Sequence, residues 1–361
     1  MAERFWKQYL NRRGFSLWSL LVPIMWGASG LYYLGNRIHR AFHGTPTRVG
    51  IPVISIGNIA TGGTGKTPIV AFLTSRLLAR GMKVGVVSSG YGRTSSRPHV
   101  GLGSELARMP AAEIGDEVKL LANQFPELTF SIAASKSDAA VQISRSGSIE
   151  VILVDDGFQH YGLHRDLDIV LWDATVPERS IHLLPFGVLR EPVSSMKRAG
   201  VVILTRVDQC EAIESVRTFV KSEAPHAHIF EARFIHTELI GRRARYPMTF
   251  LKERRVIVFA GIGNFGAFRR QIEAAGAVVV SALEFNDHQH YDQSQLRRIA
   301  DLASRENVDL IITTGKDGAK LGDFDFGREC CYLGLDLEFT LSGDNLVDTV
   351  LQHANEKDVQ R

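Results

Sequence analysis

The sequence has little of several features that mark specialised classes of protein. Its three cysteines, at positions 210, 330 and 331, are too few and too irregularly spaced for a disulfide framework or a zinc site. The formal net charge is only +3 over 361 residues, and we find no RNA-binding signature and no basic helix-turn-helix. No tandem repeat or low-complexity tract stands out. We therefore expect a globular protein of a reducing cytoplasm with no nucleic-acid partner.

The charge that is present is distributed unevenly along the chain. Residues 1–48 contain seven Lys and Arg residues and a single acidic residue, Glu3, whereas the rest of the chain has 35 Lys and Arg against 38 Asp and Glu. A basic end on a nearly neutral body is typical of proteins that contact an anionic surface. A membrane fits this pattern better than nucleic acid does.

Residues 1–46 also contain an apolar segment. No charged residue lies between Gly14 and Asn36, and three of the four tryptophans fall within the first 26 positions. The segment is long enough to span a bilayer, although Pro23, glycines and polar residues dilute its hydrophobicity. Aromatic residues with flanking arginines favour a helix lying at the membrane surface, with a true span or a helix packed on the protein's own core as the alternatives. A signal peptide fits poorly, because Arg37 and Arg40 follow where a cleavage site should lie.

The remainder of the chain alternates between apolar runs and amphipathic patterns. We expect helices at residues 66–80, 114–124 and 136–144, between strands at Val49–Ile56, Lys83–Val87, Leu128–Ile132, Ile149–Val154, Leu167–Leu171 and Val201–Leu204. A second series begins near residue 226 and includes strands at Val256–Ala260, Val278–Ala282 and Leu310–Thr313. This alternation predicts an α/β fold, a parallel sheet with helices on both faces. We place one domain at 47–225 and a smaller second α/β domain at 226–361.

The first strand leads into a glycine-rich loop that matches the Walker A pattern, with alanine at the first glycine position. The loop consists of Ala60, Thr61, Gly62, Gly63, Thr64, Gly65, Lys66 and Thr67. Small residues let the backbone wrap around phosphates with successive N–H groups pointing inward. Lys66 is expected to reach the β- and γ-phosphates of ATP, and the Thr67 hydroxyl to bind Mg²⁺. The alternative is a purely structural turn, which the strand before the loop and the helix after it argue against.

A second apolar strand, Ile149–Val154, ends in Asp155 and Asp156. A carboxylate at this position can hold Mg²⁺ directly or through water, because this cation prefers oxygen ligands. The sequence does not decide which aspartate touches the metal. Taken alone, the pair could simply begin a turn. Beside a Walker A loop it predicts the magnesium side of a P-loop NTPase-like fold.

Further motifs occur along the chain. In order they are Gly90-Tyr91-Gly92-Arg93, Gly115-Asp116-Glu117, Asp155-Asp156-Gly157-Phe158-Gln159-His160, Leu189-Arg190-Glu191-Pro192, Gly261-Ile262-Gly263-Asn264 and Asp287-His288. Together they resemble one family, the tetraacyldisaccharide 4'-kinases of lipid A synthesis. The resemblance includes the apolar basic N-terminus and extends to about Leu321. Ser89, Gln289 and Gly315 depart from the family pattern, which leaves secondary contacts open.

The resemblance implies transfer of the γ-phosphate of ATP to the 4'-hydroxyl of a tetraacyl disaccharide 1-phosphate, which gives lipid IVA. It also implies a lipid acceptor, a Gram-negative source and the cytoplasmic face of the inner membrane. Such an acceptor requires the enzyme to approach the bilayer, which agrees with the basic, apolar N-terminal segment. The second domain is then expected to close over the active site.

Within that resemblance, Asp116 is our candidate for the general base that accepts the proton of the sugar hydroxyl. A carboxylate in the first turn of a helix is the alternative explanation. His288 resembles the histidine that partners this aspartate, although a histidine in a loop is often only structural. Acceptor binding is assigned to Tyr91, Arg93, Arg190 and Glu191; for the last two, a surface ion pair is the alternative.

Other functions remain open at this level. A membrane-associated P-loop ATPase or GTPase switch would use the same loop. Partitioning ATPases often carry an additional lysine early in the loop, where this chain has Thr61. Hydrolysis without an acceptor would favour such an ATPase, and nucleotide preference would reveal a GTPase. A non-enzymatic membrane scaffold would leave Lys66 and Asp155 without a purpose.

Overall fold

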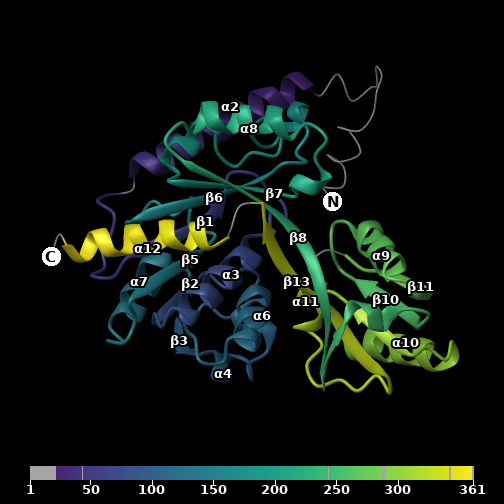
Figure 1. The fold of residues 1–361 in the computed structure, drawn as a ribbon. Coiled ribbons are helices and arrows are strands. Elements are labelled where there is room, and N and C mark those ends of the chain that lie inside the picture. The colour runs from purple at the N-terminus through teal and green to yellow at the C-terminus, as the bar shows by residue number, and fades with distance from the viewer. Residues whose placement is uncertain (1–21, 43, 243, 287–288, 341–342, 360–361) are drawn as a thin grey trace.

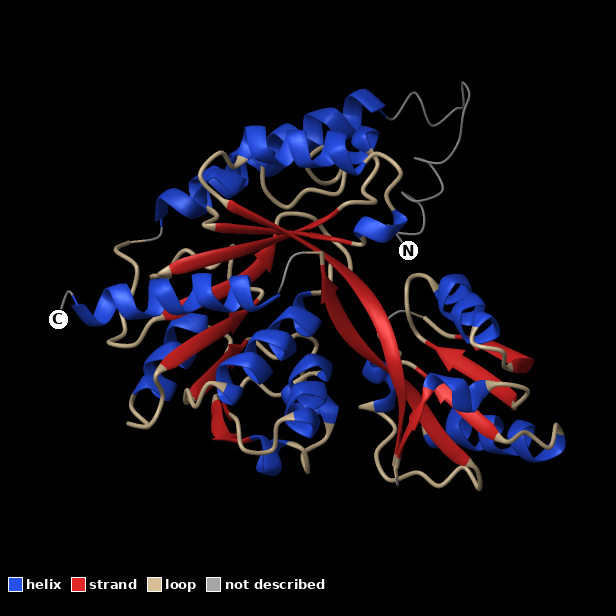
Figure 2. Cartoon of the chain, viewed as in Figure 1, coloured by secondary structure: helices blue, strands red, loops and turns tan. Residues whose placement is uncertain are grey.

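The computed structural model describes residues 22–42, 44–242, 244–286, 289–340 and 343–359 (Figure 1). Its strands form one 13-stranded sheet in the order β11-β10-β12-β13-β8-β7-β6-β1-β5-β2-β4-β3, with β9 (Arg245–Pro247) pairing with β8. Helices cover the sheet along its length (Figure 2). The expected α/β architecture is confirmed.

The half of the sheet that contains the Walker A loop is parallel except at its edge. Its parallel strands are β1 (Val53–Asn58), β2 (Val84–Ser88), β4 (Thr129–Ile132), β5 (Val151–Asp155), β6 (Leu167–Asp173) and β7 (Val201–Thr205). The edge strand β3 (His99–Leu102) is antiparallel to β4. The principal helices are α3 (Lys66–Ala79), α6 (Asp116–Gln124), α7 (Lys136–Ser144) and α8 (Ile213–Glu223), with short helices α4 (Gly103–Leu106) and α5 (Ala111–Ile114) before α6.

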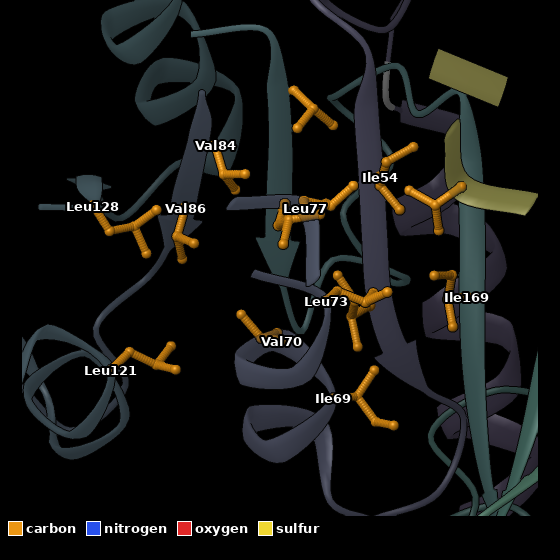
Figure 3. Close-up of a cluster of buried hydrophobic side chains, with 14 of the residues drawn as sticks. Ile54, Ile69, Val70, Leu73, Leu77, Val84, Val86, Leu121, Leu128 and Ile169 are labelled. Carbon is orange, nitrogen blue, oxygen red and sulfur yellow. The ribbon is translucent and has the colours of Figure 1, made fainter. Parts of the chain in front are cut away.

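Alternate residues of these strands enter different cores, because successive side chains of a strand point to opposite faces. Ile54 of β1 belongs to the same core as buried side chains of α3 and α6 (Figure 3), whereas its neighbour Val53 belongs to the core that contains α7. Within α3, the buried side chains Ile69, Val70, Leu73 and Leu77 fall on one face. Burial on both faces explains why the strands read as continuous apolar runs.

The C-terminal half repeats the strand–helix alternation on a smaller scale. It contains β10 (Arg255–Ala260), β11 (Val278–Glu284) and β12 (Leu310–Thr313) with the helices α9 (Phe265–Ala274), α10 (Gln293–Arg305) and α11 (Gly315–Gly318). The helix α9 packs with alternate residues of β10 in one core, and α10 packs with the others in a second core.

Two long strands join the halves. Strand β8 (His228–Gly241) is parallel to β7, and β13 (Glu329–Phe339) is parallel to β12; β8 and β13 pair antiparallel with each other (Figure 1). This junction was not predicted. Only scattered residues of β8 are buried, so it lacks the uninterrupted apolar run that identifies the other central strands.

Two helices lie at the ends of the described chain. Helix α12 (Gly343–Val359) returns to the P-loop half, where Leu346, Val347 and Val350 enter the same core as α3. Helix α2 (Val22–Phe42) exposes large apolar side chains, among them Ile24, Trp26, Leu31 and Leu34. No helix within the described ranges is both long enough and apolar enough to span a bilayer. The domain limits at 46 and 225 stay a prediction. The return of α12 adds a C-terminal helix to the first unit.

Candidate active site

The Walker A loop connects the end of β1 to the first residue of α3. Gly62 and Gly65 have positive φ angles of 107° and 92°, which L-residues with a side chain rarely adopt. Ala60, at the first glycine position, forms an antiparallel bridge with Leu189. Its φ angle is not positive, so a methyl group fits there. The loop therefore needs glycine at positions 62 and 65 and tolerates alanine at position 60.

Neighbouring segments hold the outside of this loop. Thr61 donates its backbone N–H to the Val188 carbonyl at 2.7 Å, and the Asn58 amide donates to the Thr64 hydroxyl at 2.8 Å. Arg206, at the end of β7, donates to the Gly63 carbonyl at 2.7 Å. Phe234 of β8 packs so closely that a Cβ on Gly65 would lie 2.1 Å from its ring. The loop is thus supported through its side chains and carbonyls before a ligand arrives.

Lys66 points from α3 to the end of β5. Its Nζ lies 3.3 Å from Oδ1 of Asp156, whose backbone has a positive φ of 52°. Burial alone would raise the pKa of Asp156, but Lys66, Lys136 and Arg190 hold it below its usual value. Arg190 Nη1 lies 3.2 Å from Oδ2 of Asp156. The predicted nucleotide lysine and the predicted magnesium strand therefore meet.

Asp155 has a different environment from its neighbour. Its side chain is buried, and burial followed by the charge of Glu117 raises its pKa to about 7. Within the described part of the chain, its Oδ1 atom has no hydrogen-bond partner. A buried carboxylate oxygen without a donor suits a cation. Thr67, the other predicted magnesium ligand, is buried in the first turn of α3.

Asp116 is the first residue of α6. The residue before it, Gly115, packs against the turn that carries Tyr91 and Arg93. A Cβ on Gly115 would lie 2.9 Å from the Gly90 backbone, so the two segments touch. The Asp116 carboxylate forms an ion pair with Lys320, Oδ2 to Nζ at 2.9 Å. Its predicted partner His288 lies outside the described residues.

The four predicted acceptor residues have unequal surroundings. Tyr91 is 76% exposed, and Arg93 donates to the Arg97 carbonyl at 2.8 Å. Arg190 faces Asp156, as described above. Glu191 is buried, where it accepts hydrogen bonds from Tyr161 at 2.6 Å, Gln159 at 3.0 Å and Arg198 at 3.2 Å. Glu191 thus links the segment after β5 to the segment after Leu189, and its acceptor role stays a prediction.

Helix α2 contacts the site through its polar side chains. The Tyr32 hydroxyl and the Asn36 amide both donate to the backbone carbonyl of Arg190, at 3.1 and 2.9 Å. Ser29 donates to the Leu183 carbonyl at 3.0 Å and accepts from the Phe186 N–H at 3.2 Å. Most large apolar side chains of α2 are left exposed, whereas an ordinary surface helix buries its apolar face.

Several residues that shape the site escaped sequence reasoning. Lys136 is buried and donates to the Asp156 carbonyl at 2.5 Å, and burial lowers its pKa against the opposing charges of Asp156 and Asp155. Lys316 and Lys320 reach the start of α6 from the C-terminal half. Only the position of Lys136 at the start of an expected helix was available as a signal. The other two depend on a contact between segments about 200 residues apart.

The arrangement fits a magnesium–nucleotide site of the P-loop type. Among the described residues, no group of three or more His, Cys, Asp or Glu side chains is arranged to hold a metal ion by itself. P-loop proteins do not need such a group, because phosphate oxygens complete the magnesium shell. Thr67 and the unpartnered oxygen of Asp155 are the ligands that this geometry offers.

Comparisons with known proteins identify the family to which the chain belongs. The tetraacyldisaccharide-1-P 4'-kinase family matches residues 17–355. A tetraacyldisaccharide 4'-kinase of Anaeromyxobacter sp. (strain Fw109-5) is 33% identical, with 97% of this chain and 95% of the relative covered. One of Geobacter metallireducens is 38% identical over 75% of this chain and 79% of its own length. The crystal structure of LpxK from Aquifex aeolicus in complex with ATP matches with a TM-score of 0.73 and 26% identity, covering 94% of this chain and 99% of that one. The chain therefore belongs to the tetraacyldisaccharide 4'-kinase family.

Proposed function

We propose that this protein transfers the γ-phosphoryl group of ATP to the 4'-hydroxyl of a tetraacyldisaccharide 1-phosphate, with lipid IVA as the product. The single observation that carries this proposal is the approach of Lys66 to Asp156 at 3.3 Å within a chain of this family. It joins the phosphate loop to the carboxylates after β5, and Asp116 lies at the start of a helix packed on the same core.

The nucleotide is held mainly by the backbone of residues 60–67. The N–H groups of the loop and of the first turn of α3 face the phosphates, where the helix dipole favours negative charge. Lys66 turns from Asp156 to the β- and γ-phosphates and stabilises charge on the transferring group. Mg²⁺, held by Thr67 and Asp155, would neutralise phosphate charge during transfer. Asp156 keeps Lys66 and Arg190 in place until ATP binds.

The acceptor hydroxyl is activated at the start of α6. Asp116 takes its proton as the oxygen attacks the γ-phosphorus, and His288 orients this carboxylate from the second α/β unit. The turn that carries Tyr91 and Arg93 and the guanidinium of Arg190 position the sugar and its phosphate. Closure of the second unit would exclude water, which otherwise competes for the γ-phosphate.

Helix α2 brings the enzyme to its lipid substrate. Its exposed Ile24, Trp26, Leu31 and Leu34 fit the apolar boundary of a bilayer, and basic residues nearby favour anionic lipid headgroups. Such a helix lies on the cytoplasmic face of the inner membrane rather than crossing it. Replacing Ile24, Leu31 and Leu34 by serine should weaken flotation with anionic vesicles, whereas Val278→Ser, at an exposed position of β11, should not. Deleting residues 1–40 should raise the KM for micellar acceptor more than it weakens ATP binding.

One assay tests the reaction itself. The purified protein is incubated with Mg-ATP, labelled at the γ-phosphate, and a tetraacyldisaccharide 1-phosphate in detergent micelles. The expected result is a labelled lipid that forms in step with ADP, with little ADP formed when the lipid is omitted. Equal ADP production with and without the lipid would instead indicate an ATPase, and GTP as the better donor would indicate a GTPase.

A further inference from the structure

Two lysines of the C-terminal half contact the carboxylates at the start of α6. Lys316 Nζ lies 2.8 Å from Oε1 of Glu117, and Lys320 Nζ lies 2.9 Å from Oδ2 of Asp116. Lys316 belongs to α11, and Lys320 follows two residues after this helix ends. Each of two successive carboxylates in the P-loop half is therefore paired with its own cation from the other half.

The pair formed by Lys320 is almost removed from solvent. The Lys320 side chain is 4% exposed and the Asp116 side chain 13%. An ion pair in such a place loses hydration on both sides and is maintained only when its geometry is fixed by further contacts. A surface pair between long mobile side chains would not restrict Asp116 in this way.

Those further contacts come from Asp317. Its carboxylate is fully buried and accepts hydrogen bonds from the Gly261 N–H at 3.0 Å, the Tyr291 hydroxyl at 3.0 Å and the Thr314 hydroxyl at 2.7 Å. Lys320 Nζ is 3.9 Å from the same carboxylate. Asp317 is thus a carboxylate fixed by three hydrogen bonds, and it lies near the Lys320 ammonium together with Asp116.

We propose that Lys320 is a positioning residue of the kinase reaction, which holds the Asp116 carboxylate in one orientation toward the acceptor. This inference rests on the proposed role of Asp116 as general base. During transfer, the acceptor oxygen forms a bond to the γ-phosphorus, the bond from this phosphorus to the β–γ bridging oxygen breaks, and the hydroxyl proton moves to Asp116. Lys320 takes no part in the proton transfer and touches neither substrate.

The ion pair with Lys320 leaves Asp116 able to act as a base. A carboxylate has two oxygens with about four lone-pair positions, so an ammonium on Oδ2 does not use up its capacity to accept.

Lys316 supplies a second point of attachment for the same segment. Burial alone would raise the pKa of Glu117, but Lys316 holds it below the usual value; burial alone would likewise lower the pKa of Lys316, but Glu117 raises it. Both groups are therefore charged in the folded protein. Two pairs on adjacent residues fix the direction of the first turn of α6 as well as its position.

The test compares kcat and KM across a small set of variants of the full-length protein. Lys320→Met should lower kcat by about 10–100-fold, the scale expected when a reacting group is misplaced by about 1 Å, with the KM for ATP within about twofold of wild type. Lys320→Arg should recover most of the loss because it restores the cation. Lys119→Met is the matched control, since this lysine of α6 donates only to the Ala107 and Met109 carbonyls among the contacts described, and its kcat should stay within about twofold.

Two further variants separate this inference from the proposed function. If Asp116→Asn keeps wild-type kcat, the assignment of the base is wrong. If Asp116→Asn loses activity while Lys320→Met does not, the positioning role is wrong and the base assignment stands. A higher kcat in Lys320→Met would show that the lysine masks the base, and this too would overturn the proposal.

A loss of folding in Lys320→Met does not block the test. The double variant Asp116→Asn/Lys320→Met carries no lone buried charge at this pair, so it avoids the main cost of removing one partner. Its kcat should equal that of Asp116→Asn, because the lysine acts only through the carboxylate. A double variant clearly slower than Asp116→Asn would show that Lys320 acts on something other than Asp116.

Discussion

The same local unit, a strand followed by a glycine-containing loop and a helix, occurs once in each half of the sheet, with different consequences. After β1, the loop ends at Gly65, which has no side chain to cap α3. After β10, the Asn264 side chain accepts the Ala267 N–H at 3.2 Å and caps α9, while the Gly261 N–H donates to Asp317 at 3.0 Å. One loop leaves backbone donors for a ligand, whereas the other satisfies them with the chain's own acceptors.

The strand–loop–helix topology is therefore not itself a phosphate site. The first N–H groups of any helix need acceptors, and either a side chain or an anion can provide them. Three neighbouring residues support the loop after β1. The Val188 carbonyl accepts the N–H at the start of the loop, Asn58 donates to a loop side chain, and Arg206 donates to a loop carbonyl. The C-terminal unit keeps the topology and instead uses its loop to fix Asp317 and, through it, Lys320.

The prediction with the greatest loss of activity concerns whether the loop after β1 binds the reacting phosphates. Lys66→Ala should lower kcat/KM on the order of 10³–10⁵-fold, the range for a cation that stabilises the transferring phosphoryl group. Phosphorylation of the lipid acceptor is the measurement, and Lys83→Ala, an exposed lysine just before β2, is the control. Activity within twofold of wild type would mean that residues 57–67 are not the ATP site.

The next effect tests whether the C-terminal half contributes to the chemistry or only to the structure. Asp116→Ala and His288→Ala should each lower kcat by about 10²–10⁴-fold, the usual contribution of general-base assistance, with ATP affinity nearly unchanged. The double variant should be little worse than the worse single variant, because residues that act together are not additive. The kcat of each variant is measured across pH 5–9. If the losses in kcat of the two single variants multiply in the double variant, His288 is a structural residue.

A smaller effect concerns the stability of the ligand-free site. The pKa of Asp155 is raised to about 7, so its protonated form stabilises the folded state at low pH and this contribution is lost as the pH rises through about 7. Asp155→Asn should therefore raise the melting temperature in EDTA at pH 8.5 and change it much less at pH 5.5. Asp156→Asn provides the contrast, because the pKa of Asp156 is lowered and removing its charge should destabilise the protein at pH 8.5. Shifts of the same sign in both variants would contradict the assignment of the buried charge.

The prediction with the smallest effect concerns the loop after β10, in which Asn264 caps α9. Asn264→Ala should lower the free energy of unfolding by about 1 kcal/mol, the usual value of an N-cap, and leave ATP affinity unchanged. Asp292→Ala, which removes the cap of α10, should have a similar effect and serves as the reference. Denaturant unfolding measures the stability, and calorimetry measures ATP binding. A loss of ATP affinity in Asn264→Ala alone would show that the second loop also contacts the nucleotide.

Much of the P-loop half could be predicted because its signals are local. Helix α7 has the predicted limits, α3 begins at the predicted residue, and Lys66 meets Asp156 as the paired motifs suggest. The strands β8 and β13 and the lysines at the start of α6 could not be predicted, because they depend on contacts distant in sequence. A partly exposed strand such as β8 has no hydrophobic periodicity to reveal it. A buried lysine likewise looks the same in sequence as an exposed one.

If α2 contacts the membrane as we propose, its hydrogen bonds to the Arg190 carbonyl would determine how the protein sits on a lipid surface. With the apolar side chains of α2 in the bilayer boundary, Tyr32 and Asn36 tie the backbone of a residue that touches Asp156 to that same helix. The height of the phosphate site above the headgroups is then set by the protein and not by the lipid. A sugar hydroxyl that lies lower than this height must be lifted out of the headgroup layer to react, so the work of partial extraction falls on the substrate.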